Sequence, residues 1–371
     1  MKPLFCIAFF CAVATPQFAQ QAPAPAVASG LPKNPRAIFT AAAPYYDFAD
    51  LALKPWHLKA TYQLYDADGK PGEQGNYEYW WASPTLYRSS WTRPSATRTE
   101  WQIAEGKSAS ASTGSTLNLL EFKLRSALFD PLPSDEDLDA PGVRLDVEQK
   151  AIVASGEKSP CIMVVPKMVP VGSSPVPTPQ LGLFPTYCFN PEKPILRIET
   201  SFGNLSMQFN DIRMMEGRYL AHRVDFFEGK NRLLSATVES VTMIDPTEPA
   251  LTPDGNAKVF TAQQEKQGTK VVYIDRVRLG SDVASGMLVK KVVPVYPADA
   301  KESHVSGTVL LQAIIGRDGA IHDLKVIQAP WPSLAASALQ AVSQWKYKPY
   351  VLNGEPVEVD TTVNVIYTLD R

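Results

Sequence analysis

The sequence predicts an α+β protein with two domains. The first is an antiparallel β half-barrel-like domain with a helix, and the second is a small antiparallel sheet covered by two helices. Three observations favour this fold class. The length of 371 residues suggests about two domains. Residues 36–250 carry a series of short strand patterns and one helical pattern. Residues 286–371 follow the order helix, hairpin, helix, strand.

The composition is that of an ordinary globular protein, with 45% hydrophobic and 20% charged residues. Lys plus Arg number 36 and Asp plus Glu 38, which gives a formal net charge of -2. A chain so close to neutrality lacks the positive surface that binds nucleic acids or anionic membranes. The 32 prolines favour loops and short strands over long helices.

Residues 1–19 have the layout of a secretory signal peptide. Lys2 precedes an unbroken apolar run from Leu4 to Ala14, and Ala19 offers a small residue for cleavage. A helix made of this run would reach roughly 16 Å, short of the roughly 30 Å core of a bilayer. We therefore expect export to the periplasm. An uncleaved inner-membrane anchor is the alternative.

Only two cysteines, Cys161 and Cys188, lie beyond the predicted signal peptide. An even pair in an exported protein meets an oxidising compartment, so we expect a disulfide that closes the Pro-rich segment between them. Two separately buried thiols are the alternative. Neither cysteine has a neighbouring His that would favour a catalytic thiolate.

The half-barrel-like domain, residues 36–250, is predicted from its strands. Leu58–Leu64 alternates apolar and polar residues, and Tyr77–Trp81 is a strand rich in aromatic residues. Further strand patterns lie at 88–101, 195–200, 205–209, 219–227 and 233–241. Leucines recur every fourth residue in Leu117–Phe129, which predicts an amphipathic helix that ends near Pro131.

The order of these strands, with PILRIETSFGNLSMQF followed by GRYLAHRVDFFEGKNRLLSATVESV, resembles the LolA-like periplasmic carriers of lipoproteins and lipids. In that family the concave face of the sheet holds an acyl chain. The resemblance implies a cavity for a hydrophobic ligand, lined by Tyr77–Trp81 and Trp91. A plain aromatic core is the alternative.

The sequence lacks recognisable motifs for catalysis, metals or cofactors. The four histidines, at positions 57, 222, 304 and 322, never stand at metal-ligand spacing. There is no nucleophile elbow, phosphate-binding Walker loop or dinucleotide fingerprint. We therefore expect no catalytic residues, no metal and no cofactor, and the protein is not expected to be an enzyme.

Residues 251–285 are mostly polar and are predicted to link the two domains. In residues 286–371, Thr308–Ile315 alternates apolar and polar residues, and Gly316–Gly319 forms a hairpin turn. Ser333 is suited to cap a helix. The last strand is predicted from Val357 to Leu369.

Several spaced elements of residues 296–369 resemble the TonB C-terminal domain. They are Tyr296, Pro297, Gly307, Asp318, Gly319, Trp345, Pro349, Asn353 and Gly354. The resemblance implies a binding module. In that family the last strand is a sheet edge that pairs with the TonB box, a short peptide of an outer-membrane TonB-dependent transporter, by β-augmentation.

Carried over to this chain, the edge is Val359–Tyr367. The expected partner-binding residues are Val359, Thr362, Val363, Asn364, Val365, Ile366 and Tyr367, of which 362, 364 and 366 face outward. Family members also transmit force from an inner-membrane, proton-driven motor complex. Here the apolar N-terminal run is short and a folded domain replaces the usual spacer, so we favour partner recognition in support of substrate import. A lipid or hydrophobe carrier that uses the C-terminal domain as a docking tag is the alternative function.

Overall fold

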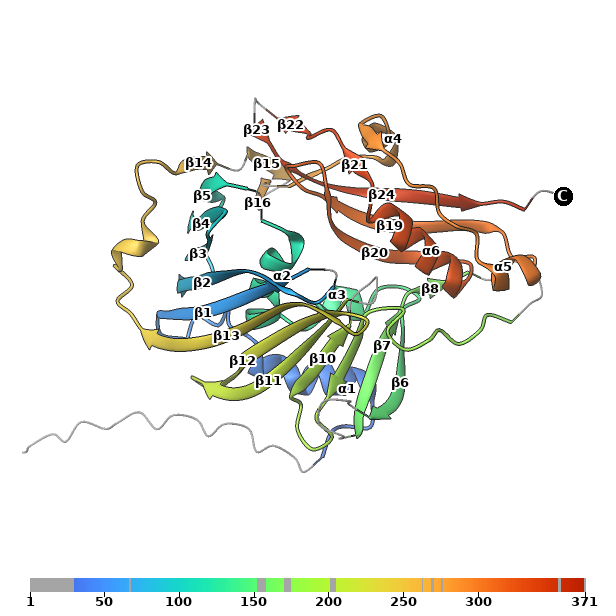
Figure 1. The fold of residues 1–371 in the computed structure, drawn as a ribbon, viewed down its shortest axis with the longest axis horizontal. Coiled ribbons are helices and arrows are strands. Elements are labelled where there is room, and N and C mark those ends of the chain that lie inside the picture. The colour runs from blue at the N-terminus through green and yellow to red at the C-terminus, as the bar shows by residue number, and fades with distance from the viewer. Residues whose placement is uncertain are drawn as a thin grey trace, which may run out of the picture.

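The structure is a computed structural model that describes residues 30–66, 68–115, 117–151, 158–169, 175–200, 205–261, 263–267, 270–274, 276–352 and 355–369. The predicted signal peptide and the Asn353-Gly354 turn lie outside the described residues. The described residues build a 13-stranded sheet, a five-stranded sheet and three two-stranded sheets (Figure 1). Two core clusters accompany the two larger sheets. The α+β fold class is confirmed.

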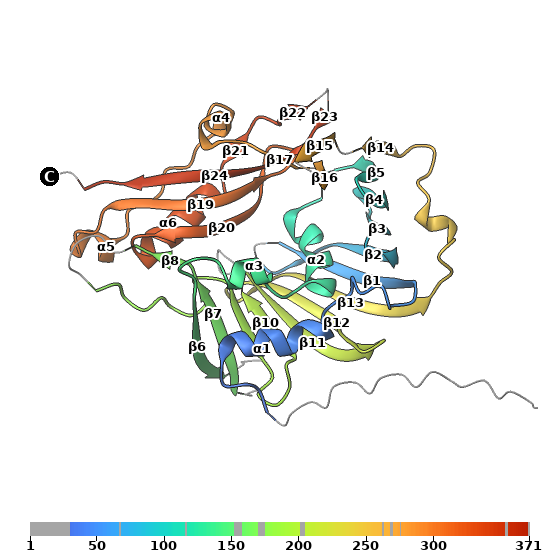
Figure 2. The same cartoon turned by 180° about the vertical axis from the view of Figure 1, so that it is seen from behind.

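The larger sheet has 13 antiparallel strands in the order β14-β5-β4-β3-β2-β1-β13-β12-β11-β10-β9-β7-β6. It curls around α2, so that the helix lies on the concave side (Figures 1 and 2). The strands are β1 (Trp56–Tyr65), β2 (Pro71–Ser83), β3 (Leu86–Arg93), β4 (Ala96–Ala104), β5 (Lys107–Gly114), β6 (Arg144–Ala151), β7 (Lys158–Val165), β9 (Thr186–Phe189), β10 (Leu196–Thr200), β11 (Leu205–Met215), β12 (Arg218–Glu228), β13 (Asn231–Met243) and β14 (Lys258–Thr261).

Short helices pack against this sheet. They are α1 (Pro35–Ala42), the 3₁₀ turn η1 (Ala43–Tyr45), α2 (Leu119–Phe129), α3 (Asp135–Leu138) and the 3₁₀ turn η3 (Pro249–Leu251). Phe39 of α1 packs edge-on against Tyr187 and Phe189 of β9. The helix predicted from the leucine spacing is α2, and Leu124 on its apolar face is fully buried.

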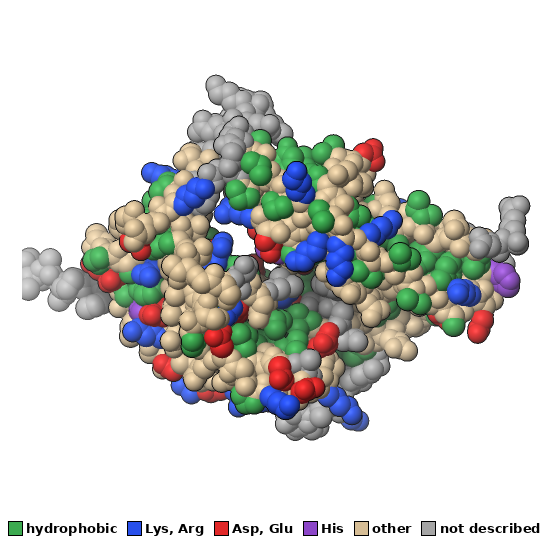
Figure 3. All heavy atoms as spheres, turned by 45° about the horizontal axis from the view of Figure 1, so that its top comes forward, with side chains coloured by type: hydrophobic (Ala, Val, Ile, Leu, Met, Phe, Trp, Pro, Cys, Tyr) green, Lys and Arg blue, Asp and Glu red, His purple; other side chains and the backbone are tan. Residues whose placement is uncertain are grey.

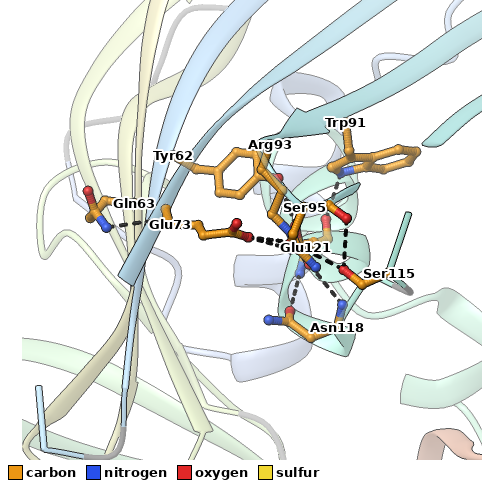
Figure 4. A network of polar contacts seen from close by, with 9 residues as sticks. All are labelled: Tyr62, Gln63, Glu73, Trp91, Arg93, Ser95, Ser115, Asn118 and Glu121. Carbon is orange, nitrogen blue, oxygen red and sulfur yellow. Dashed lines mark hydrogen bonds and ion pairs between the residues drawn. The ribbon is translucent and has the colours of Figure 1, made fainter. Parts of the chain in front are cut away.

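The buried carboxylate of Glu121 fixes α2 to the sheet (Figure 4). It accepts hydrogen bonds from Tyr62 Oη at 2.7 Å and from Arg93 Nε at 3.0 Å. It also accepts one from the backbone N–H of Asn118, whose side chain caps the helix in return. A buried carboxylate costs free energy unless it is paired, and here both oxygens have partners. The network therefore holds the first turn of α2 inside the curved sheet.

The smaller sheet has the strand order β17-β24-β19-β20-β8, and we call it, with its helices, the C-terminal domain. Helix α6 packs on β19 and β20, and α5 packs on α6. The elements in this region are β15 (Gln263–Gln267), β16 (Lys270–Ile274), β17 (Arg276–Arg278), α4 (Ser281–Ser285), β18 (Leu288–Lys290), α5 (Ala298–Glu302), β19 (Gly307–Ile315), β20 (Ile321–Ala329), α6 (Pro332–Val342), β21 (Lys346–Tyr347), β22 (Val351–Leu352), β23 (Glu355–Pro356) and β24 (Glu358–Tyr367).

The two domains share an element that the sequence did not predict. Strand β8 (Lys167–Met168) belongs to the segment between the two cysteines, yet it pairs in parallel with β20. Phe184, from the same segment, is buried in the core cluster of the C-terminal domain. The predicted disulfide between Cys161 and Cys188 is present and closes the base of this segment. The C-terminal domain is therefore docked on the half-barrel through a covalently closed loop.

The predicted linker, residues 251–285, contains strands that extend both sheets, because β14 pairs with β5 and β17 pairs with β24. Two local expectations need correction. The pattern at 88–101 is two strands, β3 and β4, joined by a turn. Ser333 does not cap α6, since the helix begins at Pro332 and Trp331 occupies the N-cap without a side-chain hydrogen bond.

Candidate partner-binding edge

Strand β24 lies between a long neighbour and a short one. Its full length pairs antiparallel with β19, from Val359 opposite Ile315 to Tyr367 opposite Gly307. On its other side only β17 pairs with it, in parallel, and that pairing covers residues 358–360. Among the described strands, no other pairs with β24. The second side of β24 is therefore unpaired from residue 361 to residue 367.

One hydrogen bond identifies the backbone groups on this open side. The N–H of Leu279, just after β17, donates to the carbonyl of Asp360 at 3.0 Å. The N–H and C=O of one residue in a strand point to the same side, and the direction alternates along the strand. The backbone groups of Thr362, Asn364 and Ile366 therefore point to the open side. Those of Val363 and Val365 point to β19.

The side chains alternate as the sequence predicted. Val359, Val363, Val365 and Tyr367 are buried in the core of the C-terminal domain, and Asn364 and Ile366 are exposed. Ile366 is 69% exposed and presents an apolar side chain beside the open side of the strand. Val359 differs from the expectation, because β17 lies beside it and Thr361 Oγ1 donates to the carbonyl of Leu279. The open edge is thus shorter than Val359–Tyr367.

The residues that resemble the TonB family lie at the two ends of the C-terminal sheet. At one end, the ring of Tyr296 packs edge-on against the ring of Tyr367. Tyr367 is paired with Gly307 in the sheet, and Pro297 is the N-cap of α5. Burial raises the pKa of Tyr367, so this ring stays neutral near pH 7.

At the other end, Gly319 has a φ of 76° and closes the turn after Asp318. A Cβ there would lie 1.9 Å from the carbonyl oxygen of Tyr347, so only glycine fits. Trp345 donates its indole N–H to the carbonyl of Val292 at 2.8 Å. The motif residues described by the structure hold the fold, whereas the open edge consists mainly of backbone groups.

A cavity of about 760 Å³ lies between α2 and the sheet. Tyr79, Trp81, Tyr87, Phe129 and Arg125 are among the residues that line it. The guanidinium of Arg125 lies 4.4 Å from the ring centre of Tyr87, a cation–π contact. Burial raises the pKa of Tyr79 to about 12.

The aromatic residues singled out in the sequence divide into two groups. Tyr77, Tyr79, Trp81 and Trp91 are all buried in the same core cluster, and of these four only Tyr79 and Trp81 also border the cavity. Trp80 stacks on His57 instead, at 4.2 Å between ring centres. The expected aromatic lining is therefore only partly formed.

A second hollow of about 580 Å³ lies between the two domains. Figure 3 shows the surface hollowed there, with side chains of both charges around it. Arg98 and Lys123 line it from the half-barrel, and Asp318 and His322 line it from the C-terminal domain. The described residues include no group of three or more His, Cys, Asp or Glu side chains that could hold a metal ion.

The open side of an edge strand can accept an extended peptide by strand addition. Residues 292–369 match the family model described as Gram-negative bacterial TonB protein C-terminal. The protein TonB of Vibrio cholerae serotype O1 is 29% identical over 107 residues, which are 29% of this chain and 41% of that protein. This chain thus spans less than half of the length of that relative.

Two solved structures are similar to parts of the chain. The C-terminal domain of TonB from Pseudomonas aeruginosa is 26% identical, with 23% of this chain and 86% of that chain covered and a TM-score of 0.21. A LolA superfamily protein from Nitrosomonas europaea is 10% identical, with 59% and 97% covered and a TM-score of 0.33.

Proposed function

We propose that this protein is a periplasmic, non-enzymatic TonB-like protein that binds outer-membrane TonB-dependent transporters by strand addition. The observation that carries the proposal is the open side of β24, where the backbone groups of Thr362, Asn364 and Ile366 have no strand partner among the described residues. An extended TonB box peptide would complete the sheet there, and such main-chain pairing gives affinity. Binding would support substrate import across the outer membrane.

The side chains around this edge support recognition of a peptide. Ile366 offers an exposed apolar contact, and Asn364 offers an amide beside it. Alternate side chains of an added strand would face these residues and provide selectivity. No helix in the described part of the chain is both long and apolar enough to cross a bilayer.

The proposal is tested by site-specific photo-crosslinking from position 364 in native cell envelopes, followed by mass spectrometry of the adduct. We expect capture of the N-terminal segment of an outer-membrane transporter. A photo-crosslinker at position 312 of β19, which pairs with Thr362 inside the sheet, is the matched control. Capture of soluble periplasmic proteins alone, or equal capture from both positions, would contradict strand addition at β24.

The cavity beside α2 favours a second candidate function, that of a carrier for a lipid or another hydrophobic molecule. Its volume of about 760 Å³ suits a ligand of that size, and aromatic side chains line much of it. A delipidated sample should then take up a fluorescent fatty-acid probe in proportion to protein. Phe129→Asp, which places a charge in the lining, should abolish uptake, and Met243→Asp at the exposed end of β13 is the control.

A further inference from the structure

We propose that β17 is a displaceable strand of this chain that competes with the partner for the edge of β24. The proposal rests on the proposed function for the identity of the partner. It concerns the part of the β24 edge that a partner strand can reach, and the release of β17 that must come before the partner pairs there. Three features of β17 support it: its position, its short pairing and its exposure.

The position of β17 overlaps the edge that a partner strand would use. Strand β17 is the last strand of the sheet on this side, and it occupies the edge of β24 at residues 358–360. The remaining open side runs from residue 361 to residue 367, so a partner strand of about five or six residues could pair there without touching β17. A partner strand that pairs along nearly the whole of β24, as β19 does over nine residues, would extend into the part of β24 that β17 covers.

The attachment of β17 is weak in comparison with its neighbours. It pairs through three residues, whereas β19 pairs with β24 through nine. Arg278 is 83% exposed, so its ion pair with Asp360 at 3.2 Å lies largely in water and contributes little. Besides the ladder hydrogen bonds of its three paired residues, the segment is held by the backbone bond from Leu279 to Asp360, by the bond from Thr361 Oγ1 to Leu279 and by packing of the half-buried Leu279 against the core. This part of the sheet can open locally while β19 and β20 stay paired.

Hydrogen exchange on the native full-length protein tests the local opening. The Leu279 N–H, which binds Asp360, should exchange at least about tenfold faster than the Val365 N–H, which points to β19. Equal protection of the two amides would overturn the proposal, because β17 would then open only with the whole domain.

A binding experiment tests the competition directly. The probe is a fluorescent peptide with the sequence of residues 276–282, RVRLGSD. The N–H of Val277 points to β24, as that of Leu279 does, so Val277→Pro should release β17. The N–H of Arg278 points away, which makes Arg278→Pro the matched control. If β17 is closed in roughly 90% of molecules, its release should tighten peptide binding about tenfold.

A locked variant provides the opposite test. Arg278 and Asp360 lie side by side in β17 and β24, so R278C with D360C should form a disulfide across the two strands. The oxidised protein should lose peptide binding relative to R278S with D360S. Unchanged binding in both the released and the locked proteins would overturn the proposal. Because the probe comes from this chain, the result does not depend on whether position 364 captures a transporter.

Discussion

Cys161 and Cys188 lie directly opposite each other on β7 and β9 and are joined by a disulfide. Between these two residues the chain leaves the half-barrel, adds β8 to the C-terminal sheet and buries Phe184 in the core of the C-terminal domain. The disulfide thus anchors the segment through which the two domains are joined. In this arrangement the C-terminal sheet, which contains β24, is attached to the half-barrel by strand pairing and by core packing.

Removal of the disulfide should destabilise the protein. The two cysteines are 27 residues apart, and a loop of this length corresponds to roughly 3 to 4 kcal/mol in the chain-entropy model. C161S with C188S should therefore lower the free energy of unfolding by about this amount in urea titrations. Alkylation of both thiols in denatured protein without a reductant would show that the disulfide does not form.

Removal of the Glu121 carboxylate should lower the free energy of unfolding more than removal of the neighbouring Glu73 carboxylate. Glu121→Ala leaves the guanidinium of Arg93, which is only 9% exposed, without its buried partner. Removal of one partner of a buried ion pair costs about 3 to 5 kcal/mol. Glu73→Ala is the control, because Glu73 lies at the more exposed end of the same network. This substitution should lower the free energy of unfolding much less. Equal losses in urea denaturation would contradict the role of Glu121.

Prolines at adjacent positions of β24 should have different effects. Asn364→Pro removes an N–H that points to the open side, so the fold should persist and partner crosslinking should fall. Val365→Pro removes an N–H that points to β19, and the lost bond should destabilise the domain by about 1 to 3 kcal/mol. Thermal unfolding and crosslinking yields separate the two effects. The reverse result would mean that the backbone directions are assigned wrongly.

Stability should fall as the pH rises towards neutrality because of Glu199. The pKa of this carboxyl is raised from an ordinary value of 4.5 to about 7, mainly by burial; Lys123 lowers the pKa, and Asp130 and Asp323 raise it. The folded protein therefore holds a proton that the unfolded chain releases, and the stabilisation is lost as the pH rises from about 4.5 to 7. Glu199→Gln should remove this part of the pH dependence in urea titrations at pH 5 and pH 8.

Local patterns were sufficient to predict much of the fold. The strand predicted from the alternation in Leu58–Leu64 lies within β1. The helix predicted from the leucine spacing in Leu117–Phe129 overlaps α2. Strand β5, with the sequence KSASASTG, was missed because its small residues give no apolar alternation. Strand β17 lies in the predicted linker, and its sequence could not show that β24 is its neighbour.

The sequence by itself determined which side chains of β24 face the core, because side chains alternate with a period of two along any strand. It also identified the two cysteines that pair and the C-terminal family. Only the tertiary structure decided which backbone groups of β24 remain unpaired. That outcome depends on β17 and β19, whose hydrogen bonds with β24 join residues far apart in the sequence. Pairing of this kind follows from the packing of the whole domain, and no local pattern encodes it.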